Sequence, residues 1–227
     1  MGTIKNKYLD KISNDFQLLS EIVLTQISYI RMMVKEGHSD LSEELEKNEI
    51  LIDGLDLKMR EEVINAIFLF SPKAIDLRKI IAYHNMTIYL ERIGDLILNI
   101  SHFLHKNKLN IKKYAELEMP LSKMLKYAEE MLKNAVFAFT CEDNSMAYQA
   151  ISADDKVDEL YHTLTKNIHV YFSGKTLDVS DLVYITSMNS ILYNVERIAD
   201  NATNIAEAAI YLVEGKDIRH GNNNDKG

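Results

Sequence analysis

The sequence is poor in the residues that break or cross-link a chain. Among its 227 residues there is one cysteine, Cys141, so no disulfide can form within the chain. We expect this residue to be a buried or half-buried structural thiol. Eight glycines and two prolines are few for this length, and sheets joined by tight turns need more of both. These shortages favour a helical protein without disulfides.

The sequence also lacks a long apolar run and an excess of basic residues. Its longest apolar stretch, residues 63–70, is far shorter than the roughly 20 residues that span a bilayer. The N-terminus has no apolar core of the kind found in signal peptides. The net charge of −8 gives a surface that repels phosphate backbones. We therefore expect a cytoplasmic protein that does not bind nucleic acid directly and reaches membranes only through partners.

Apolar residues recur every three or four positions along almost the whole chain, which is the spacing of an amphipathic helix. Breaks such as residues 37–40 and 173–175 separate six such stretches. We expect Ser71 to cap the third helix, with Pro72 as its first residue, and the tail after Glu214 to be disordered. The expected helices span residues 5–36, 40–69, 72–106, 113–140, 144–172 and 178–213.

The second half of the chain repeats the first at a constant offset of 105 residues. Residues 49–101 align with 154–206 without a gap, and the identical positions concentrate in polar residues. Core packing alone does not preserve polar residues, so the repeat indicates a duplicated functional site. The sequence therefore predicts an all-α protein of two tandem three-helix bundles, residues 1–107 and 108–214, followed by a tail, residues 215–227.

Each half carries two pairs of acidic residues four positions apart, a spacing that places both members of a pair on one face of a helix. In each half, both pairs lie about 20 residues from the turn between the second and third helices, or about 30 Å along two antiparallel helices. We therefore expect four carboxylates to meet at one height in each half. They are Glu49, Asp53, Glu91 and Asp95 in the first half and Asp154, Asp158, Glu196 and Asp200 in the second.

Four facing carboxylates cannot all stay ionised unless a positive charge compensates them. A multivalent cation would do so, and an oxygen-rich site suits Mg²⁺, Mn²⁺ or iron, with Zn²⁺ as a further candidate. A single acidic pair is usually only a solvated helix face, but this arrangement occurs twice at one offset. Arg92 and Arg197 lie one residue, or 100°, from the acidic face, so we expect them to point aside. The E-x-x-H pair Glu159–His162 occurs once, whereas di-iron bundles need it twice.

Two short segments carry a family resemblance. Residues 90–95 (LERIGD) and 195–200 (VERIAD) are each followed, after three residues, by Asn-Ile. They resemble the paired signature of the PhoU family, whose members are regulators of bacterial phosphate uptake. Residues 71–78 (SPKAIDLR) resemble the segment that opens the third helix in that family. The likeness extends from about residue 8 to residue 214.

The resemblance implies multinuclear metal clusters, with iron or zinc as the expected metals and manganese and magnesium as alternatives. If the family's ligands are carried over to the matching positions, the metal ligands are the eight acidic residues named earlier. It also implies a non-enzymatic negative regulator that links the ATPase of a phosphate ABC transporter to the sensor histidine kinase controlling phosphate-starvation genes. Such proteins often form homodimers.

Three alternatives stay open at this point. One is a carboxylate-bridged metalloenzyme, the second is a helical scaffold without metal, and the third is an accessory protein of a low-affinity phosphate permease. The second half also departs from the family pattern. It has Leu177, Val183 and Ala199 where the pattern has proline, arginine and glycine, and Asp154 is shorter than Glu49. All eight acids are nevertheless present, so we expect two sites of unequal affinity.

Overall fold

The computed structural model describes residues 2–36, 41–106, 109, 111 and 115–215, and within these residues there are helices and turns but no strand. The expected break at residues 37–40 and the expected disorder after residue 215 lie outside the described residues. The six helices are α1 (Gly2–Glu36), α2 (Leu41–Phe70), α3 (Ala74–Lys106), α4 (Ala115–Cys141), α5 (Asn144–Phe172) and α6 (Val179–Glu214).

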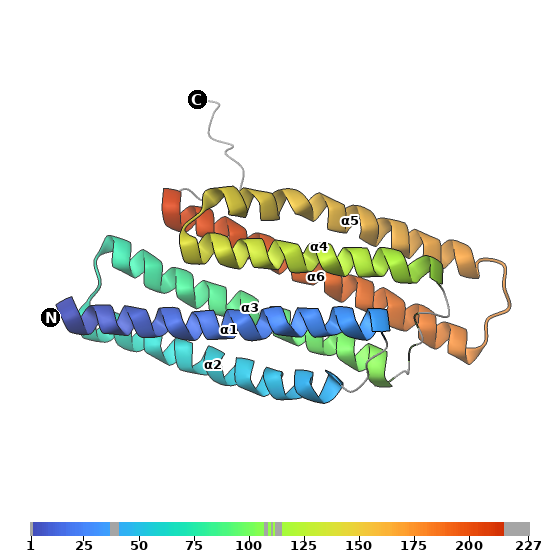
Figure 1. Cartoon of the computed structure of the whole chain (residues 1–227), viewed down its shortest axis with the longest axis horizontal. Coiled ribbons are helices and arrows are strands. Elements are labelled where there is room, and N and C mark those ends of the chain that lie inside the picture. The colour runs from blue at the N-terminus through green and yellow to red at the C-terminus, as the bar shows by residue number, and fades with distance from the viewer. Residues whose placement is uncertain (1, 37–40, 107–108, 110, 112–114, 216–227) are drawn as a thin grey trace, which may run out of the picture.

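The helices form two three-helix bundles that lie side by side (Figure 1). Helices α1–α3 make the first bundle and α4–α6 the second, and the bundles meet through α3 against α6 and α1 against α4. Helices α3 and α6 run in opposite directions, so the tips of the α2–α3 and α5–α6 hairpins lie at opposite ends of the molecule (Figure 1). The predicted all-α fold of two tandem bundles is confirmed. Among the described helices, none has the length and apolar character that crossing a bilayer requires.

An aromatic cluster joins the two bundles at the α1–α4 contact. Phe16 of α1, Tyr83 of α3 and Phe139 of α4 pack with ring centroids 5.0–5.4 Å apart. All three side chains are buried, and the edge-to-face pairs that Tyr83 makes with Phe16 and Phe139 contribute beyond the area they remove from water. The core is therefore continuous between the bundles. Cys141, expected to be at least half-buried, is instead exposed at the end of α4.

The turn between α2 and α3 differs from its prediction. Ser71 does not cap α3, which begins at Ala74. Ser71 has φ 42°, and its N–H donates to the carbonyl of Ile67 at 3.2 Å, so it terminates α2 in the left-handed region. A residue before proline is kept out of the right-handed helical region by the proline ring, which explains why α2 stops there. In the second bundle, Asp178 caps α6.

A partly buried ion pair also links the bundles. Glu129 of α4 is buried and pairs with Arg31 of α1 and with Lys133. Burial acts to raise the pKa of Glu129, but its bonds to Lys133 and Arg31 outweigh burial and lower the pKa.

Removing Arg31 tests this contact. We expect Arg31→Met to lower the free energy of unfolding by about 1–3 kcal/mol, because buried Glu129 would keep a single cation. The matched control is Lys126→Met, whose pair with Glu130 is exposed at 3.5 Å and is worth less than about 1 kcal/mol. Urea denaturation measures both. Equal effects would show that the Arg31–Glu129 pair contributes no more than a surface pair.

Candidate metal centre

Helices α2 and α3 bring the four acids of the first bundle together; we call Glu49, Asp53, Glu91 and Asp95 the first cluster. Glu49 is the most buried, with 7% of its surface exposed. Its carboxylate accepts a hydrogen bond from Gln26 Nε2 of α1 at 3.4 Å and lies within the electrostatic influence of Asp95. Glu49 Oε1 is buried without a hydrogen-bond partner. Asp53 and Asp95 are exposed at the mouth of the cluster, so the acids run from the interior to the surface.

The electrostatics of the first cluster disfavour its full ionisation. Burial, followed by the charges of Asp95 and Asp53, raises the pKa of Glu49 to about 7, against the small lowering effect of Gln26. Burial also raises the pKa of Glu91, and the charges of Asp95 and Asp56 add to this effect. The charges of Asp53 and Asp95 thus act on both Glu49 and Glu91, and this repulsion disfavours ionisation of the cluster.

Asp56 and Arg60 are neighbours of the first cluster that the sequence reasoning missed. Asp56 is buried on α2 and pairs with Arg60 Nε at 2.8 Å. The charge of Asp56 raises the pKa of Glu91, whereas that of Arg60 lowers it. The available signal was spacing, since Asp56 follows Glu49 by seven residues and so lies on the same face. Its counterpart in the second half is Tyr161, so the acidic pattern does not repeat there.

Helices α5 and α6 bring together Asp154, Asp158, Glu196 and Asp200, which we call the second cluster. Burial, then the charges of Asp158, Asp200 and Asp155, raises the pKa of Asp154 to about 6, against the small lowering effect of Thr203. Burial also raises the pKa of Glu196 and of Asp200. Asp154 Oδ1 is buried without a hydrogen-bond partner, as Glu49 Oε1 is in the first cluster. In both clusters, therefore, burial and neighbouring negative charges disfavour full ionisation of the carboxyl groups.

Arg197 contradicts the expectation that the motif arginines point aside. Its Nη1 lies 3.0 Å from Asp200 and its Nε lies 3.6 Å from Glu196. The long side chain reaches Asp200, which lies one turn further along the helix, and its guanidinium also lies over the ring of Tyr193. Arg197 lowers the pKa of Glu196 and of Asp200 against the effect of burial. Part of the second cluster is thus already neutralised by the chain itself.

The shape of each cluster depends on a small residue in the third helix of the repeat. A Cβ atom added to Gly94 would lie 3.0 Å from Glu49 Oε2 and 3.0 Å from Ile52 Cδ1. Both contacts are tighter than ordinary van der Waals packing, so Glu49 and Ile52 occupy the space that glycine leaves. In the second repeat Ala199 replaces this glycine, and Asp154 and Val157 replace the two larger residues. The extra methyl group on α6 is thus matched by a shorter acid and a smaller apolar residue on α5.

This compensation gives a testable prediction. We expect Gly94→Ala to displace the Glu49 carboxylate and weaken metal binding at the first cluster about 10–100-fold, the usual range for residues that support ligands. Adding Glu49→Asp and Ile52→Val recreates the packing of the second repeat, and we expect it to restore most of the affinity. Calorimetric titration of chelator-treated protein measures the change. If Gly94→Ala alone left the affinity unaltered, the proposed packing constraint would be wrong.

The carboxylate oxygens of the two clusters suit a cation chemically, although they do not surround a common point in the structure. Within the described part of the chain, no three histidine, cysteine, aspartate or glutamate side chains have ready-made metal-binding geometry. The fit rests on the buried, unbonded oxygens Glu49 Oε1 and Asp154 Oδ1, which lie among further carboxylates. An oxygen donor set of this kind suits hard divalent cations.

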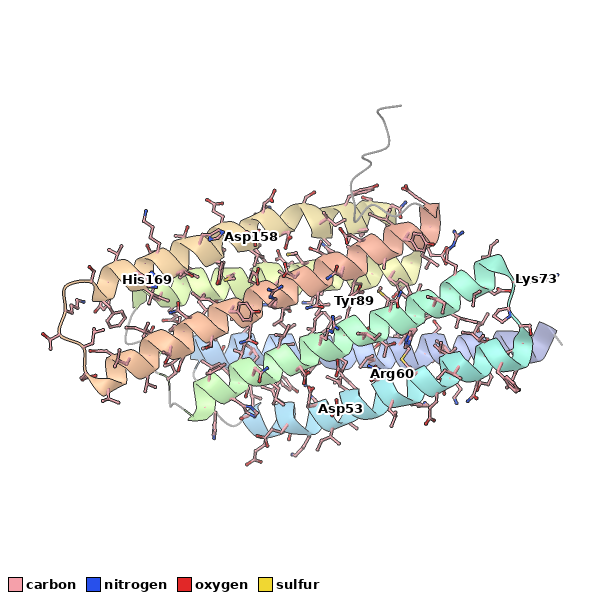
Figure 2. The ribbon with its side chains drawn as sticks, turned by 180° about the vertical axis from the view of Figure 1, so that it is seen from behind. Asp53, Arg60, Lys73, Tyr89, Asp158 and His169 are labelled. Carbon is pink, nitrogen blue, oxygen red and sulfur yellow. The ribbon has the colours of Figure 1, made fainter. Side chains whose placement is uncertain are left out.

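Both clusters open toward the contact between the bundles. A groove of about 780 Å³ lies between α3 and α6, lined by Asp95 of the first cluster and by Asp154 and Asp200 of the second. Figure 2 shows Asp53 on α2 and Asp158 on α5, with α3 and α6 between them. The two acidic sites therefore flank one central helix pair.

Comparison with known proteins gives a consistent picture. A model of the PhoU domain matches the chain twice, over residues 16–104 and 121–209, so the second match begins and ends 105 residues after the first. A protein of Aquifex aeolicus named phosphate-specific transport system accessory protein PhoU homolog is 30% identical over 223 residues, which cover 97% of this chain and 98% of that protein. A homologue of the same name from Clostridium acetobutylicum is 25% identical over 92% of this chain and 94% of its own length.

Solved structures agree with this comparison. The crystal structure of PhoU from Pseudomonas aeruginosa superposes with a TM-score of 0.83 at 25% identity, covering 93% of this chain and 99% of that one. A regulatory PhoU protein of the phosphate transport system from Streptococcus pneumoniae has the same fold, with a TM-score of 0.82 at 23% identity over 94% and 99% of the two chains. The fold and the clusters define a class of two-repeat helical proteins with one acidic site in each three-helix unit. The chain belongs to the PhoU family.

Proposed function

We propose that this protein is a cytoplasmic, non-enzymatic regulator that binds metal in its two acidic clusters and links phosphate transport to phosphate-starvation signalling. The observation that carries the proposal is the carboxyl group at the base of each cluster, the buried Glu49 in the first and the half-buried Asp154 in the second. Each has a raised pKa and an oxygen atom without a hydrogen-bond partner. Such groups are costly to ionise in the protein alone and are stabilised by a multivalent cation.

In this proposal the eight acids hold the metal. Glu49, Asp53, Glu91 and Asp95 bind in the first bundle, and Asp154, Asp158, Glu196 and Asp200 bind in the second. The metal, iron or zinc by family resemblance, supplies positive charge and fixes the second and third helices of each bundle relative to each other. Because α3 and α6 also form the contact between the bundles, the clusters set the shape of the surface offered to partners.

The proposed partners follow from the relatives. The proteins of Aquifex aeolicus and Clostridium acetobutylicum are named as accessory proteins of the phosphate-specific transport system. The protein of Streptococcus pneumoniae is named as a regulatory protein of phosphate transport. These names support a partner within the phosphate-specific transport system. The partners that we propose, by family resemblance, are the ATPase of a phosphate ABC transporter and a sensor histidine kinase, with negative regulation of the kinase pathway as the outcome.

Capture of these two partners tests the proposal. Immobilised protein loaded with metal is expected to retain both the transporter ATPase and the kinase from the same organism. The double variant Asp95→Asn with Asp200→Asn is expected to retain much less, whereas Asp10→Asn, an exposed change on α1, should behave as the native chain does. If the double variant retained both partners as well as the native chain does, the metal sites would not be needed for partner binding. Failure of the native protein to retain either partner would contradict the regulatory role.

A further inference from the structure

Gln26 of α1 is a polar side chain enclosed in the apolar core of the first bundle. None of its surface is exposed, and the residues about one turn away on either side, Val23 and Ile30, are apolar and equally buried. Glutamine is mostly found at protein surfaces, because a buried amide costs free energy unless its polar atoms are hydrogen-bonded. Gln26 meets this condition only in part, since its Oε1 has no hydrogen-bond partner among the described residues. Apolar packing alone therefore does not account for this residue.

The amide nitrogen of Gln26 holds the most buried acid of the first cluster. Nε2 donates to Glu49 Oε2 at 3.4 Å and to the backbone carbonyl of Leu45 at 3.3 Å. Leu45 and Glu49 are about one turn apart on α2, so one side chain of α1 contacts two successive turns of the neighbouring helix. The bond to Glu49 occupies one oxygen of the carboxylate and leaves the other, Oε1, unbonded. Gln26 therefore orients the carboxylate without taking the oxygen that a cation could bind.

Donation from Gln26 also favours the charged form of Glu49. A hydrogen bond to a carboxylate stabilises its ionised form, and the bond from Gln26 lowers the pKa of Glu49 against the raising effects of burial and the neighbouring acids. Carboxylates bind metal ions in their ionised form. A neutral donor suits this place better than lysine or arginine would, because a fixed positive charge beside Glu49 would repel the metal.

The second repeat supports its acid without the first helix of the bundle. The position that corresponds to Gln26 is Met131 of α4, which is buried and has no N–H or O–H group to donate. The polar neighbour that lowers the pKa of Asp154 is instead Thr203, which lies on α6. The three-helix fold therefore does not require glutamine at this place in the repeat, and its presence in α1 has a separate cause.

We propose that Gln26 is a positioning residue of the first metal site, where it fixes the Glu49 carboxylate so that Oε1 binds the metal. The first site is then built by three helices, with α1 supplying the donor and α2 and α3 supplying the ligands. The second site uses only α5 and α6. The inference rests on the proposed metal binding and extends it, because the metal then restrains all three helices of the first bundle and only two of the second.

Giving the first repeat the residue of the second tests the positioning role. Gln26→Met removes the donor and introduces a flexible side chain that the second repeat already accommodates in its core. Chelator-treated full chain is titrated with Zn²⁺ in an Asp200→Asn background, which isolates the first cluster, and Gln26→Met is expected to weaken binding there about 10–100-fold. The matched control Gln17→Met makes the same change at an exposed position of α1 and should leave the affinity unaltered. In an Asp95→Asn background, which isolates the second cluster, Gln26→Met should have no effect.

Cobalt spectroscopy separates positioning from a general loss of stability. At saturating Co²⁺ the absorption bands report how the ligands are arranged around the metal. In the Asp200→Asn background, Gln26→Met should shift these bands, whereas Gln17→Met should leave them in place. A loss of stability alone would not move the spectrum of a filled site.

The two experiments distinguish failure of this inference from failure of the proposed function. Unchanged Zn²⁺ affinity, or an unchanged Co²⁺ spectrum, in Gln26→Met would overturn the positioning role alone. If the Asp200→Asn chain bound neither metal, the first metal site itself would be wrong, and the positioning role with it.

Discussion

In metal-free protein at pH 8, Glu49→Gln is expected to raise the free energy of unfolding by about 1–3 kcal/mol, a range discounted for the solvent that reaches the cluster. Burial beside Asp95 and Asp53 raises the pKa of Glu49 to about 7, so the fold disfavours its charged form. Glutamine has nearly the same shape, carries no charge and can keep the contact with Gln26. A residue that we propose as a metal ligand would thus destabilise the protein when the metal is absent.

The same effect gives a pH dependence whose sign follows from the shift. The pKa of Glu49 is raised from 4.5 in the unfolded chain to about 7 in the fold, so the folded state holds a proton that the unfolded state has released. Its stabilising effect is complete below about pH 4.5 and is lost as the pH rises through about 7. Asp154 adds a second loss between 3.8 and about 6. Metal-free native protein should therefore be less stable at pH 8 than at pH 5.5.

Chemical denaturation at several pH values measures this dependence. The native chain should lose stability between pH 5.5 and 8, and Glu49→Gln should lose clearly less. Glu159→Gln, an exposed change on α5, should follow the native curve within about 0.5 kcal/mol. A native chain that is as stable at pH 8 as at pH 5.5 would show that the first cluster is not under electrostatic strain.

The second large effect concerns metal affinity. Asp95→Asn is expected to weaken binding at the first cluster at least about 100-fold while leaving the second intact, and Asp200→Asn should do the reverse, because each removes a proposed ligand rather than its support. Because Arg197 already pairs with Asp200 and Glu196, we expect the first cluster to fill before the second. Competition with a chelator of known affinity, read by elemental analysis, resolves the two steps. Asp10→Asn is the control.

Two outcomes would contradict this assignment. Native stoichiometry and affinity in the combined Asp95→Asn and Asp200→Asn variant would place the metal elsewhere. Simultaneous loss of both metals in each single variant would show one shared site in the α3–α6 groove instead of two. Replacing Arg197 by glutamine tests the expected order of filling. The change should strengthen metal binding at the second cluster and leave the affinity of the first cluster unaltered.

Helix positions and the meeting of the acids could be predicted because both follow from the helical repeat. Helix α5 spans Asn144–Phe172, as predicted, and α6 (Val179–Glu214) lies within one residue of its predicted range at each end. Counting residues from the turns was enough to place Glu49 against Asp95 and Asp154 near Asp200. Backbone geometry at one residue could not be read in this way: Ser71 ends α2 instead of starting α3.

Features that depend on side-chain shape were beyond the sequence. Helical periodicity places Arg197 100° from the acidic face, but its long side chain reaches Asp200 one turn away. The fit of Glu49 and Ile52 over Gly94 becomes visible only when three helix positions are seen in contact. The apolar residues on the outer face of α2 have the spacing of a buried helix face, and only the structure shows that they are exposed. They are Ile50, Leu57, Ile64 and Phe68. Periodicity identifies a face without saying what covers it.

Anomalous diffraction from crystals grown with zinc or iron is the most direct test of the metal sites. We expect one group of peaks between α2 and α3, within bonding distance of Glu49 and Asp95, and another between α5 and α6, beside Asp154 and Asp200. No anomalous signal at either cluster in fully loaded crystals, or signal confined to exposed histidines such as His162 and His169, would contradict the assignment.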